Sequence, residues 1–226
     1  MMTNLDKVAT YKELVAARKA CFDCNGLYNP SRIENGRFDG NHVGPWTSWQ
    51  GNLNAKLMVV GQDWGGDKYF KCKKGREKDT NSTNVRLRAF LEQIGVKIEM
   101  SGHSQGPGHL YFTNAILCCR EGLLTTGGVK SAWFRNCESK LRAQIELVRP
   151  KVVVTLGYFA YRSVLSSFGV PPKSKMREAI RTTNIHLPGQ RSIVVPVYHC
   201  GNNGTRSRPL EHQAKDWNRV KAALES

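Results

Sequence analysis

The chain has 226 residues, of which 40% are hydrophobic and 23% are charged, as in an ordinary globular protein. Its 34 Lys and Arg residues outnumber its 18 Asp and Glu residues, and the formal net charge of +16 favours polyanionic partners, with nucleic acid first and an anionic membrane surface second. No apolar run approaches the roughly 20 residues of a membrane-spanning helix, and no signal peptide is recognisable, so we expect one cytoplasmic domain over residues 1–226.

The first fifty residues are predicted to combine a helix with an irregular segment. Apolar side chains recur at helical spacing over Lys7–Cys24, which indicates an amphipathic helix. Asn25–Gln50 is rich in Gly, Asn, Pro and Ser, a composition typical of irregular structure. We treat residues 1–50 as the N-terminal part of the same domain.

Short apolar runs alternate with amphipathic segments through the rest of the chain. Four runs bounded by turn residues are predicted to be strands buried on both faces: Lys56–Val60, Leu110–Ile116, Val152–Leu156 and Ile193–Val197. Helical spacing predicts helices over Asn84–Ile94, Phe134–Val148, Tyr158–Phe168 and Pro209–Leu224. Pro196 is unfavourable within the last run because it cannot donate to a ladder. The alternation predicts an α/β fold with a central four-stranded, mostly parallel sheet.

Polar side chains stand at the carboxyl ends of three of these strands, where ligands bind in folds of this class. Asp63 lies in the Gly61-Gln62-Asp63-Trp64-Gly65 loop, and its carboxylate can orient a water or stabilise a developing cation. Asn114 offers a donor and an acceptor that suit the edge of a base. His199 can donate to an anionic oxygen.

Each of these side chains has a purely structural alternative. A single Asp can cap a helix, a single Asn can be satisfied by nearby backbone, and a single His is more often structural than catalytic. Three such groups at three strand ends together favour a functional site. The basic stretches Lys71–Lys78 and Lys173–Arg181 can likewise be solvated faces, whereas the total charge favours nucleic acid.

The order of these features resembles the uracil-DNA glycosylase superfamily from Cys21 to the last helix. Gly61-Gln62-Asp63 is similar to the first motif of its best-known branch, which continues with Pro-Tyr where this chain has Trp64-Gly65. His199-Cys200-Gly201 stands where that branch has His-Pro-Ser. Thr113–Cys118 and Asn136–Gly157 resemble most strongly the iron–sulfur branch, called family 4. The resemblance implies a three-layer α/β/α fold and an enzyme, expected to be a monomer, that removes uracil from DNA.

The iron–sulfur branch holds its cluster through four cysteines. Matching residues occur here in the family's order: Cys21, Cys24, Cys118 and Cys137. The resemblance therefore implies a 4Fe–4S cluster, with zinc as the alternative because the same thiolates suit it. The number of residues between Asn114 and the cysteine favours Cys118 as the third ligand. The arginine that directly follows Cys119, Arg120, favours Cys119 instead. Two further cysteines match no ligand position: Cys72 and Cys200.

The resemblance also implies a role for each residue at the strand ends. Asp63 is expected to position the attacking water and to stabilise the cation-like sugar. Asn114 is expected to bind the uracil edge and to reject cytosine. His199, assisted by Gln62 and nearby backbone N–H groups, is expected to stabilise the departing base.

Two other kinds of contact follow from the same resemblance. An aromatic ring downstream of the first motif is expected to stack on the base, and Phe70, Tyr69 and Trp64 are the candidates. Arg206 and Arg208 are expected to contact the DNA backbone or to fill the gap left by the base.

Three other functions remain open from the sequence. The first is a glycosylase for hypoxanthine, xanthine or a modified uracil, because the first and last motifs are altered. The second is a DNA-binding protein that recognises lesions without turnover. The third is a metal-dependent redox protein, which no Gly-rich dinucleotide fingerprint supports.

Overall fold

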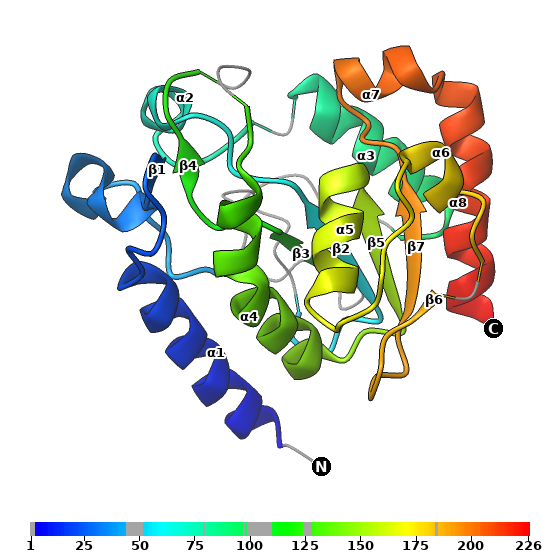
Figure 1. Cartoon of the computed structure of the whole chain (residues 1–226), viewed down its shortest axis with the longest axis horizontal. Coiled ribbons are helices and arrows are strands. Elements are labelled where there is room, and N and C mark those ends of the chain that lie inside the picture. Colours follow the sequence, from blue (N-terminus) through cyan, green and yellow to red (C-terminus); the bar gives the residue numbers. More distant parts are fainter. Residues whose placement is uncertain are drawn as a thin grey trace.

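The computed structural model describes residues 3–43, 52–78, 80–96, 98, 110–123, 128–183 and 185–226, so residues 44–50 of the predicted irregular stretch lie outside the described residues. The elements in chain order are α1 (Asn4–Lys19), β1 (Leu27–Tyr28), the 3-10 helix η1 (Pro30–Gly36), β2 (Leu57–Gly61), α2 (Asp67–Cys72), α3 (Ser82–Gln93), β3 (Leu110–Asn114), β4 (Cys119–Arg120), α4 (Ser131–Val148), β5 (Val152–Leu156), α5 (Tyr158–Ser166), α6 (Met176–Ala179), β6 (Ile185–His186), β7 (Ile193–Val197), α7 (Asn202–Ser207) and α8 (Leu210–Glu225) (Figure 1). No described helix is long and apolar enough to cross a membrane.

The main sheet has the strand order β3-β2-β5-β7-β6. Its parallel strands β2, β3, β5 and β7 coincide with the four predicted runs, so the prediction of a mostly parallel α/β sheet is confirmed. The predicted count of four strands was too low, because β6 pairs antiparallel with β7 through two residues only and is too short to leave a sequence pattern. This pairing reaches Val194, so Pro196 lies on a part of β7 that does not pair with β6.

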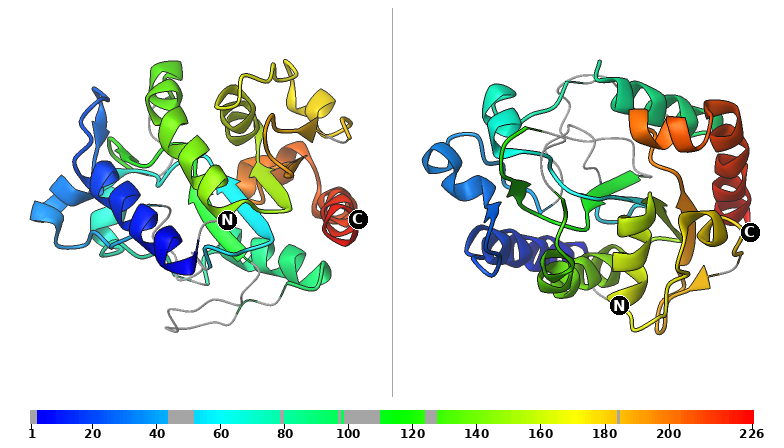
Figure 2. Two further views of the ribbon diagram at one scale, coloured as in Figure 1. Left: turned by 90° about the horizontal axis from the view of Figure 1, so that it is seen from below. Right: turned by 45° about the horizontal axis from the view of Figure 1, so that its top comes forward.

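Alternate side chains of each strand face two helical layers. In β2, Met58 and Val60 belong to the core formed with α4 and α5, whereas Leu57 and Val59 belong to the core formed with α3 and α8. This division arises because successive side chains of a strand point to opposite faces. The left panel of Figure 2 shows α4 and α5 on one side of the sheet and α3 on the other. The predicted three-layer α/β/α arrangement is confirmed.

Helix α1 begins and ends earlier than the predicted helix. It begins early because Thr3 and Asp6 form a capping box: Thr3 Oγ1 accepts from the Asp6 N–H (3.2 Å), and Asp6 Oδ2 accepts from the Thr3 N–H (2.9 Å). At its end, the Asn29 amide donates to the carbonyl oxygens of Arg18 (2.7 Å) and Lys19 (3.2 Å), and so satisfies acceptors that the last turn of a helix leaves without an intrahelical partner.

The end of α4 was predicted correctly. Arg149 adopts a left-handed conformation (φ 53°), and its N–H donates to Ile145 O (2.8 Å). Pro150 follows and cannot continue a helix. The helices α2, α6 and α7, which the sequence pattern missed, span four to six residues and are too short for periodicity to reveal.

Candidate active site

The carboxyl ends of the four parallel strands meet at a cavity of about 660 Å³. Its wall includes residues that end or follow each strand: Gly61 to Gly65 from β2, Asn114 from β3, Gly157 to Phe159 after β5, and Tyr198 and His199 after β7. Further walls come from the segment that leads into α3 and from α7. The structure thus brings Asp63, Asn114 and His199 into one cavity.

Asn114 reaches the cavity beside a glycine. The strand register pairs Gly61 of β2 with Asn114 of β3. A Cβ atom on Gly61 would lie 2.3 Å from Asn114 Oδ1, so this close approach of the amide requires glycine. Asn114 is 4% exposed, and its amide lines a site where a planar ligand can use both its donor and its acceptor.

The Asp63 carboxylate has partners at both oxygens. Oδ1 accepts a hydrogen bond from the Gly65 N–H (2.8 Å), and Oδ2 accepts one from Gln62 Nε2 (2.7 Å). Arg120 Nε lies 3.1 Å from Oδ2 and forms an ion pair with it. The Asp63 side chain is only 5% exposed, so these partners and the cavity wall cover most of the carboxylate.

His199 is held in one tautomer. Its Nδ1 accepts a hydrogen bond from the Gly201 N–H (2.9 Å), so in the neutral ring the proton is on Nε2. Burial lowers the pKa of His199 below its usual 6.5, and the nearby Asp63 carboxylate offsets part of this shift. The ring is therefore a neutral donor through Nε2 near pH 7. The tight turn needs glycines, since a Cβ on Gly201 would lie 2.8 Å from Nδ1 and one on Gly204 would clash with His199 O.

The predicted stacking aromatics are placed differently from one another. Trp64 lines the cavity, although it is 3% exposed. Phe70 is fully buried against Ile33, and its ring meets the Trp64 ring edge-on at 5.7 Å, so the structure does not bring Phe70 to the cavity. The Tyr69 hydroxyl donates to Glu77 Oε2 (2.5 Å). Four other rings, which the sequence did not single out as stacking candidates, line the cavity: Phe112, Tyr158, Phe159 and Tyr198.

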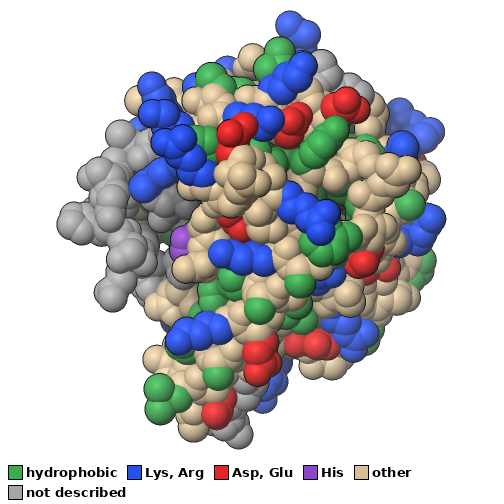
Figure 3. Space-filling view, turned by 90° about the vertical axis from the view of Figure 1, so that its left-hand side faces the viewer, with side chains coloured by type: hydrophobic (Ala, Val, Ile, Leu, Met, Phe, Trp, Pro, Cys, Tyr) green, Lys and Arg blue, Asp and Glu red, His purple; other side chains and the backbone are tan. Residues whose placement is uncertain are grey.

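Exposed basic side chains lie next to the cavity in three segments. Three cavity-lining residues have exposed basic neighbours in the chain: Glu77 (Arg76 and Lys78), Met176 (Lys175 and Arg177) and Ser207 (Arg206). On the face of the molecule seen in Figure 3, by contrast, Lys and Arg are interspersed with Asp and Glu. The cavity rim is therefore where the surplus positive charge adjoins a concave site.

The two predicted DNA-contacting arginines are not equivalent. Arg206 is exposed on α7. Arg208 binds Asp216 of α8 in a two-pronged ion pair, with Nε 2.5 Å from Oδ2 and Nη2 2.8 Å from Oδ1. The guanidinium of Arg208 is thus committed to tying the end of α7 to α8, and Arg206 is the arginine of this pair that faces solvent.

The four predicted ligand cysteines gather where the N-terminal segment meets α4. The pKa of Cys118 is raised by burial and further by the neighbouring Cys137, Cys21 and Cys24. Cys119 lies elsewhere: it packs with Trp64 and Phe70, and its charged neighbours include Asp63 and Asp67. Of the two adjacent cysteines, Cys118 is therefore the one beside the other three thiols. Among the described residues, no three Cys, His, Asp or Glu side chains lie close enough to hold a single metal ion.

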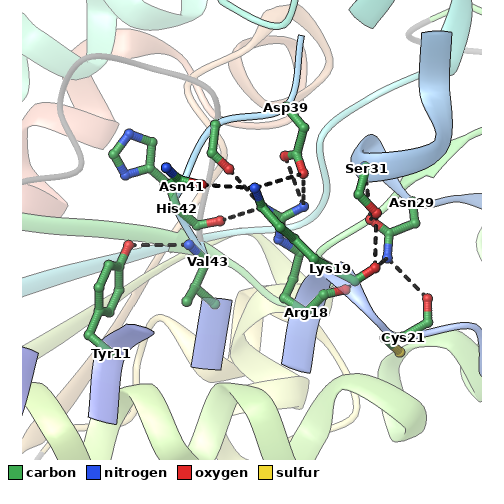
Figure 4. Close-up of polar contacts among 11 residues, drawn as sticks. Tyr11, Arg18, Lys19, Cys21, Asn29, Ser31, Asp39, Asn41, His42 and Val43 are labelled. Atoms are coloured by element: carbon green, nitrogen blue, oxygen red, sulfur yellow. Dashed lines mark hydrogen bonds and ion pairs between the residues drawn. The ribbon is translucent and has the colours of Figure 1, made fainter. Parts of the chain in front are cut away.

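Side chains of Asn29, of α1 and of α4 hold the segment that follows α1 and carries Cys21 and Cys24. The Asn29 amide donates to Cys21 O (3.0 Å), and Arg18, which is 1% exposed, binds Asp39 and the carbonyls of Gly40 and His42 (Figure 4). From α4, two side chains make three contacts to the same segment: Asn136 Nδ2 donates to Cys24 Sγ (3.4 Å) and to Asp23 O (2.8 Å), and Trp133 Nε1 donates to Asn25 O (3.0 Å). Buried polar contacts thus fix a segment that lacks regular structure.

The sequence reasoning missed several residues of the cavity wall. Arg120 was considered only as a marker for the neighbouring cysteine, although its guanidinium reaches Asp63. Glu77 lies inside the basic run Lys71–Lys78, which hid a lone carboxylate. Asn81 caps α3 by accepting from the Thr83 N–H (2.8 Å) and also lines the cavity. A helix cap before a predicted helix was the one signal that could have located this wall.

Comparison with known proteins agrees with this architecture. Residues 48–221 match the family model of the Uracil DNA glycosylase superfamily. A type-5 uracil-DNA glycosylase of Pyrobaculum aerophilum is 32% identical over 145 residues, which cover 61% of this chain and 58% of that relative. A type-4 uracil-DNA glycosylase of Archaeoglobus fulgidus is 24% identical over 170 residues, or 75% of this chain and 77% of that relative. The chain thus spans less than two thirds of the first relative and about three quarters of the second.

The family match covers all four parallel strands, the loop with Asp63, the strand with Asn114 and the turn with His199. It also covers two of the predicted ligand cysteines, Cys118 and Cys137, while Cys21 and Cys24 precede it. The family predicted from the motifs is confirmed, and the chain belongs to the uracil-DNA glycosylase superfamily.

Proposed function

We propose that the protein is a DNA glycosylase that flips uracil out of DNA and hydrolyses its N-glycosidic bond in base excision repair. The observation that carries this proposal is the meeting of Asp63, Asn114 and His199 in one cavity at the carboxyl edge of the sheet. The family match and the two relatives named as uracil-DNA glycosylases support the same activity.

In this proposal, Asp63 and Asn114 act on opposite parts of the nucleotide. The Asn114 amide donates to and accepts from the uracil edge, and cytosine is rejected because its exocyclic amine would meet the amide N–H group. The buried Asp63 carboxylate orients the attacking water and stabilises the positive charge that develops on the sugar.

His199 acts on the leaving group. The Gly201 N–H occupies Nδ1, so the Nε2–H is the available donor to the oxygen of the departing uracil anion. Because burial keeps the ring neutral, its one N–H proton is on Nε2 and can be donated in a hydrogen bond to that oxygen. Base and sugar are thus stabilised from two sides as the bond breaks.

DNA is the proposed partner because of the charge around the cavity. The exposed basic residues beside the cavity wall can neutralise phosphates on either side of a flipped nucleotide. Extruding the base from a duplex costs a few kcal/mol, and such phosphate contacts help to offset that cost.

A direct excision assay tests the activity. The protein, purified without oxygen, is incubated with single- and double-stranded oligonucleotides that contain one uracil, and alkali then cleaves any abasic site. Cleavage at the uracil is the expected result. Asp63→Asn should lower turnover by about 10²- to 10⁴-fold while changing DNA affinity little. A wild-type protein that binds lesion DNA but leaves every base intact would indicate a lesion-binding protein instead.

A glycosylase for a larger or modified base is the second candidate. Gly65 lines the cavity without a side chain, with φ of +81°, where the best-known branch has Tyr. Oligonucleotides with hypoxanthine, xanthine or 5-substituted uracil decide between the two, since faster release of one of these bases than of uracil would favour the second candidate.

We also propose that Cys21, Cys24, Cys118 and Cys137 hold a 4Fe–4S cluster. The donor set fits: four thiols from three segments influence one another, and Asn136 donates to one of their sulfurs (Cys24 Sγ, 3.4 Å). Burial lowers the pKa of Lys140, but the adjacent Cys21, Cys137 and Asp23 outweigh it and raise the pKa overall, so a cation remains beside the thiolates. When bound, the cluster would cross-link these segments without taking part in bond cleavage.

Metal analysis tests the cluster. Protein purified without oxygen should be brown and contain iron and inorganic sulfide. Colourless protein with stoichiometric zinc would replace the cluster with a zinc site.

A further inference from the structure

Arg120 is attached to the Asp63 loop at two levels. The Arg120 backbone N–H donates to Gly65 O (2.8 Å), and Arg120 forms an isolated parallel β-bridge with Gly66. A Cβ atom on Gly66 would lie 2.0 Å from Gly122 O, so the two backbones approach as closely as glycine allows. The side chain then places Nε 3.1 Å from Asp63 Oδ2, inside the cavity.

The pair is shielded from water. The side chains of Asp63 and Arg120 are 5% and 11% exposed. Removing one partner of such a pair leaves the other as an uncompensated buried charge, which is costly. The Asp63 carboxylate therefore depends on Arg120 as well as on its two hydrogen bonds for its orientation.

Two effects of the Arg120 charge oppose each other in the proposed reaction. A cation beside Asp63 weakens the stabilisation that the carboxylate gives to a cation-like sugar. The same cation restrains the carboxylate before the substrate enters, and a misplacement of about 1 Å can cost about 100-fold in rate. Arg120 Nε lies 3.1 Å from Oδ2, and Oδ1 accepts from the Gly65 N–H, so the two carboxylate oxygens are held by different groups and rotation of the carboxylate is resisted.

We propose that Arg120 is a positioning residue that acts through Asp63, an inference that rests on the proposed glycosylase function. Arg120 also belongs to the two-residue strand β4, which directly follows Cys118 and pairs with β1. The cysteine site and the catalytic carboxylate are thus joined through three consecutive residues of one backbone segment. Arg120 thereby couples the position of that backbone segment to the orientation of the Asp63 carboxylate in the cavity.

A double-mutant cycle tests this role. Single-turnover excision of uracil is measured with enzyme in excess for the wild type, Arg120→Gln, Asp63→Asn and the double variant. Arg120→Gln should slow excision by about 10- to 100-fold, whereas in the Asp63→Asn background it should change the rate less than about threefold. Arg120→Lys, which keeps the charge but loses the planar group, should recover part of the rate.

Binding and folding controls separate positioning from other roles. Affinity for an oligonucleotide with 2′-fluoro-2′-deoxyuridine, whose fluorine slows formation of the cation-like sugar, should change less than about threefold in Arg120→Gln. The matched control is Arg142→Gln on α4, where an exposed Arg142–Glu146 pair (2.8 Å) is lost and the rate should stay at the wild-type value.

Several outcomes of these experiments would overturn the proposal. An equal loss of rate in both backgrounds, or a loss of affinity as large as the loss of rate, overturns the positioning role. Unchanged excision by Arg120→Gln overturns it as well. A wild-type protein that releases none of the bases tested overturns the proposed glycosylase function, and the role of Arg120 with it.

Discussion

The cavity and the cysteine site are built in different ways. The cavity lies where four parallel strands end, and its key side chains follow directly from buried strands. The cysteine site lies outside the main sheet, and side chains of Asn29 and of α4 hold its N-terminal segment through contacts to backbone carbonyls. The geometry of the first is fixed by backbone pairing, and that of the second by individual side chains.

This contrast predicts different responses to substitution. A change in the cavity should alter chemistry while the fold persists, because the sheet does not depend on the polar groups at its edge. A change at the cysteine site should alter folding, because few backbone ladders hold that region together: β1 and β4 pair through two residues each. Measurements that separate activity from stability can therefore test whether the two sites differ in this way.

The largest effect is expected from Cys118→Ala, with Cys119→Ala as its matched neighbour. Loss of a proposed ligand should remove most of the iron and lower the melting temperature by roughly 10 °C. Cys119 packs with Trp64 and Phe70, so its loss should cost about 1 kcal/mol or less and leave iron content unchanged. Iron analysis and thermal unfolding of both variants make the comparison. Iron lost from the Cys119 variant alone would exchange their assignments.

A smaller effect on stability, but a strong one on activity, is expected from Gly61→Ala. The new Cβ would lie 2.3 Å from Asn114 Oδ1, and the flexible amide can swing away while the strands remain paired. Excision of uracil should fall by about 100-fold, and discrimination against cytosine should weaken. Gly128→Ala is the control, because a Cβ there meets no atom within 4 Å. A Gly61→Ala protein that is unfolded would mean that the cavity edge supports the fold after all.

The two arginines near α7 should show a third, more modest difference. Arg206 is exposed, so Arg206→Ala should weaken DNA binding and lower the slope of log affinity against log salt by about 1. Arg208 is committed to Asp216, so Arg208→Ala should lower the melting temperature and leave the salt slope nearly unchanged. Binding titrations at several salt concentrations provide the measurement. Equal slopes for both variants would remove Arg206 from the DNA interface.

The same contrast explains what the sequence could and could not predict. The strands were readable because they are continuous apolar runs, and the rule that ligands bind at carboxyl ends then located Asp63, Asn114 and His199. No local pattern could reveal that Phe70 turns inward against Ile33 and away from the cavity. Adjacent residues such as Cys118 and Cys119 share a sequence environment, and only their opposite directions in space distinguish them.

Tertiary contacts also decided the roles of charged residues. Arg206 and Arg208 look alike in the sequence, and the difference comes from Asp216, eight residues beyond Arg208 on another helix. Arg120 became visible as a partner of Asp63 only when β4 was placed beside the Asp63 loop. Charge and spacing predict that such groups matter, but their partners depend on the fold.

The smallest expected effect concerns the pH dependence of stability at His199. Burial lowers the pKa of His199 below 6.5, and the Asp63 carboxylate opposes part of this shift. Between the folded pKa and 6.5, the unfolded chain therefore binds a proton on this side chain that the folded chain does not bind. The free energy of unfolding falls as pH drops through that window, whereas His199 contributes no pH dependence above about pH 7.

Substitution of His199 should remove this contribution. The melting temperature of the wild type should fall more between about pH 7.5 and about pH 5.5 than that of His199→Gln, while His212→Gln, which alters an exposed side chain on α8, should keep the wild-type fall. If His199→Gln fell as steeply as the wild type, His199 would be protonated equally in both states. The surroundings of His199 would then be more hydrated than its burial indicates, which would weaken the contrast between a preformed cavity and a cysteine site held by individual side chains.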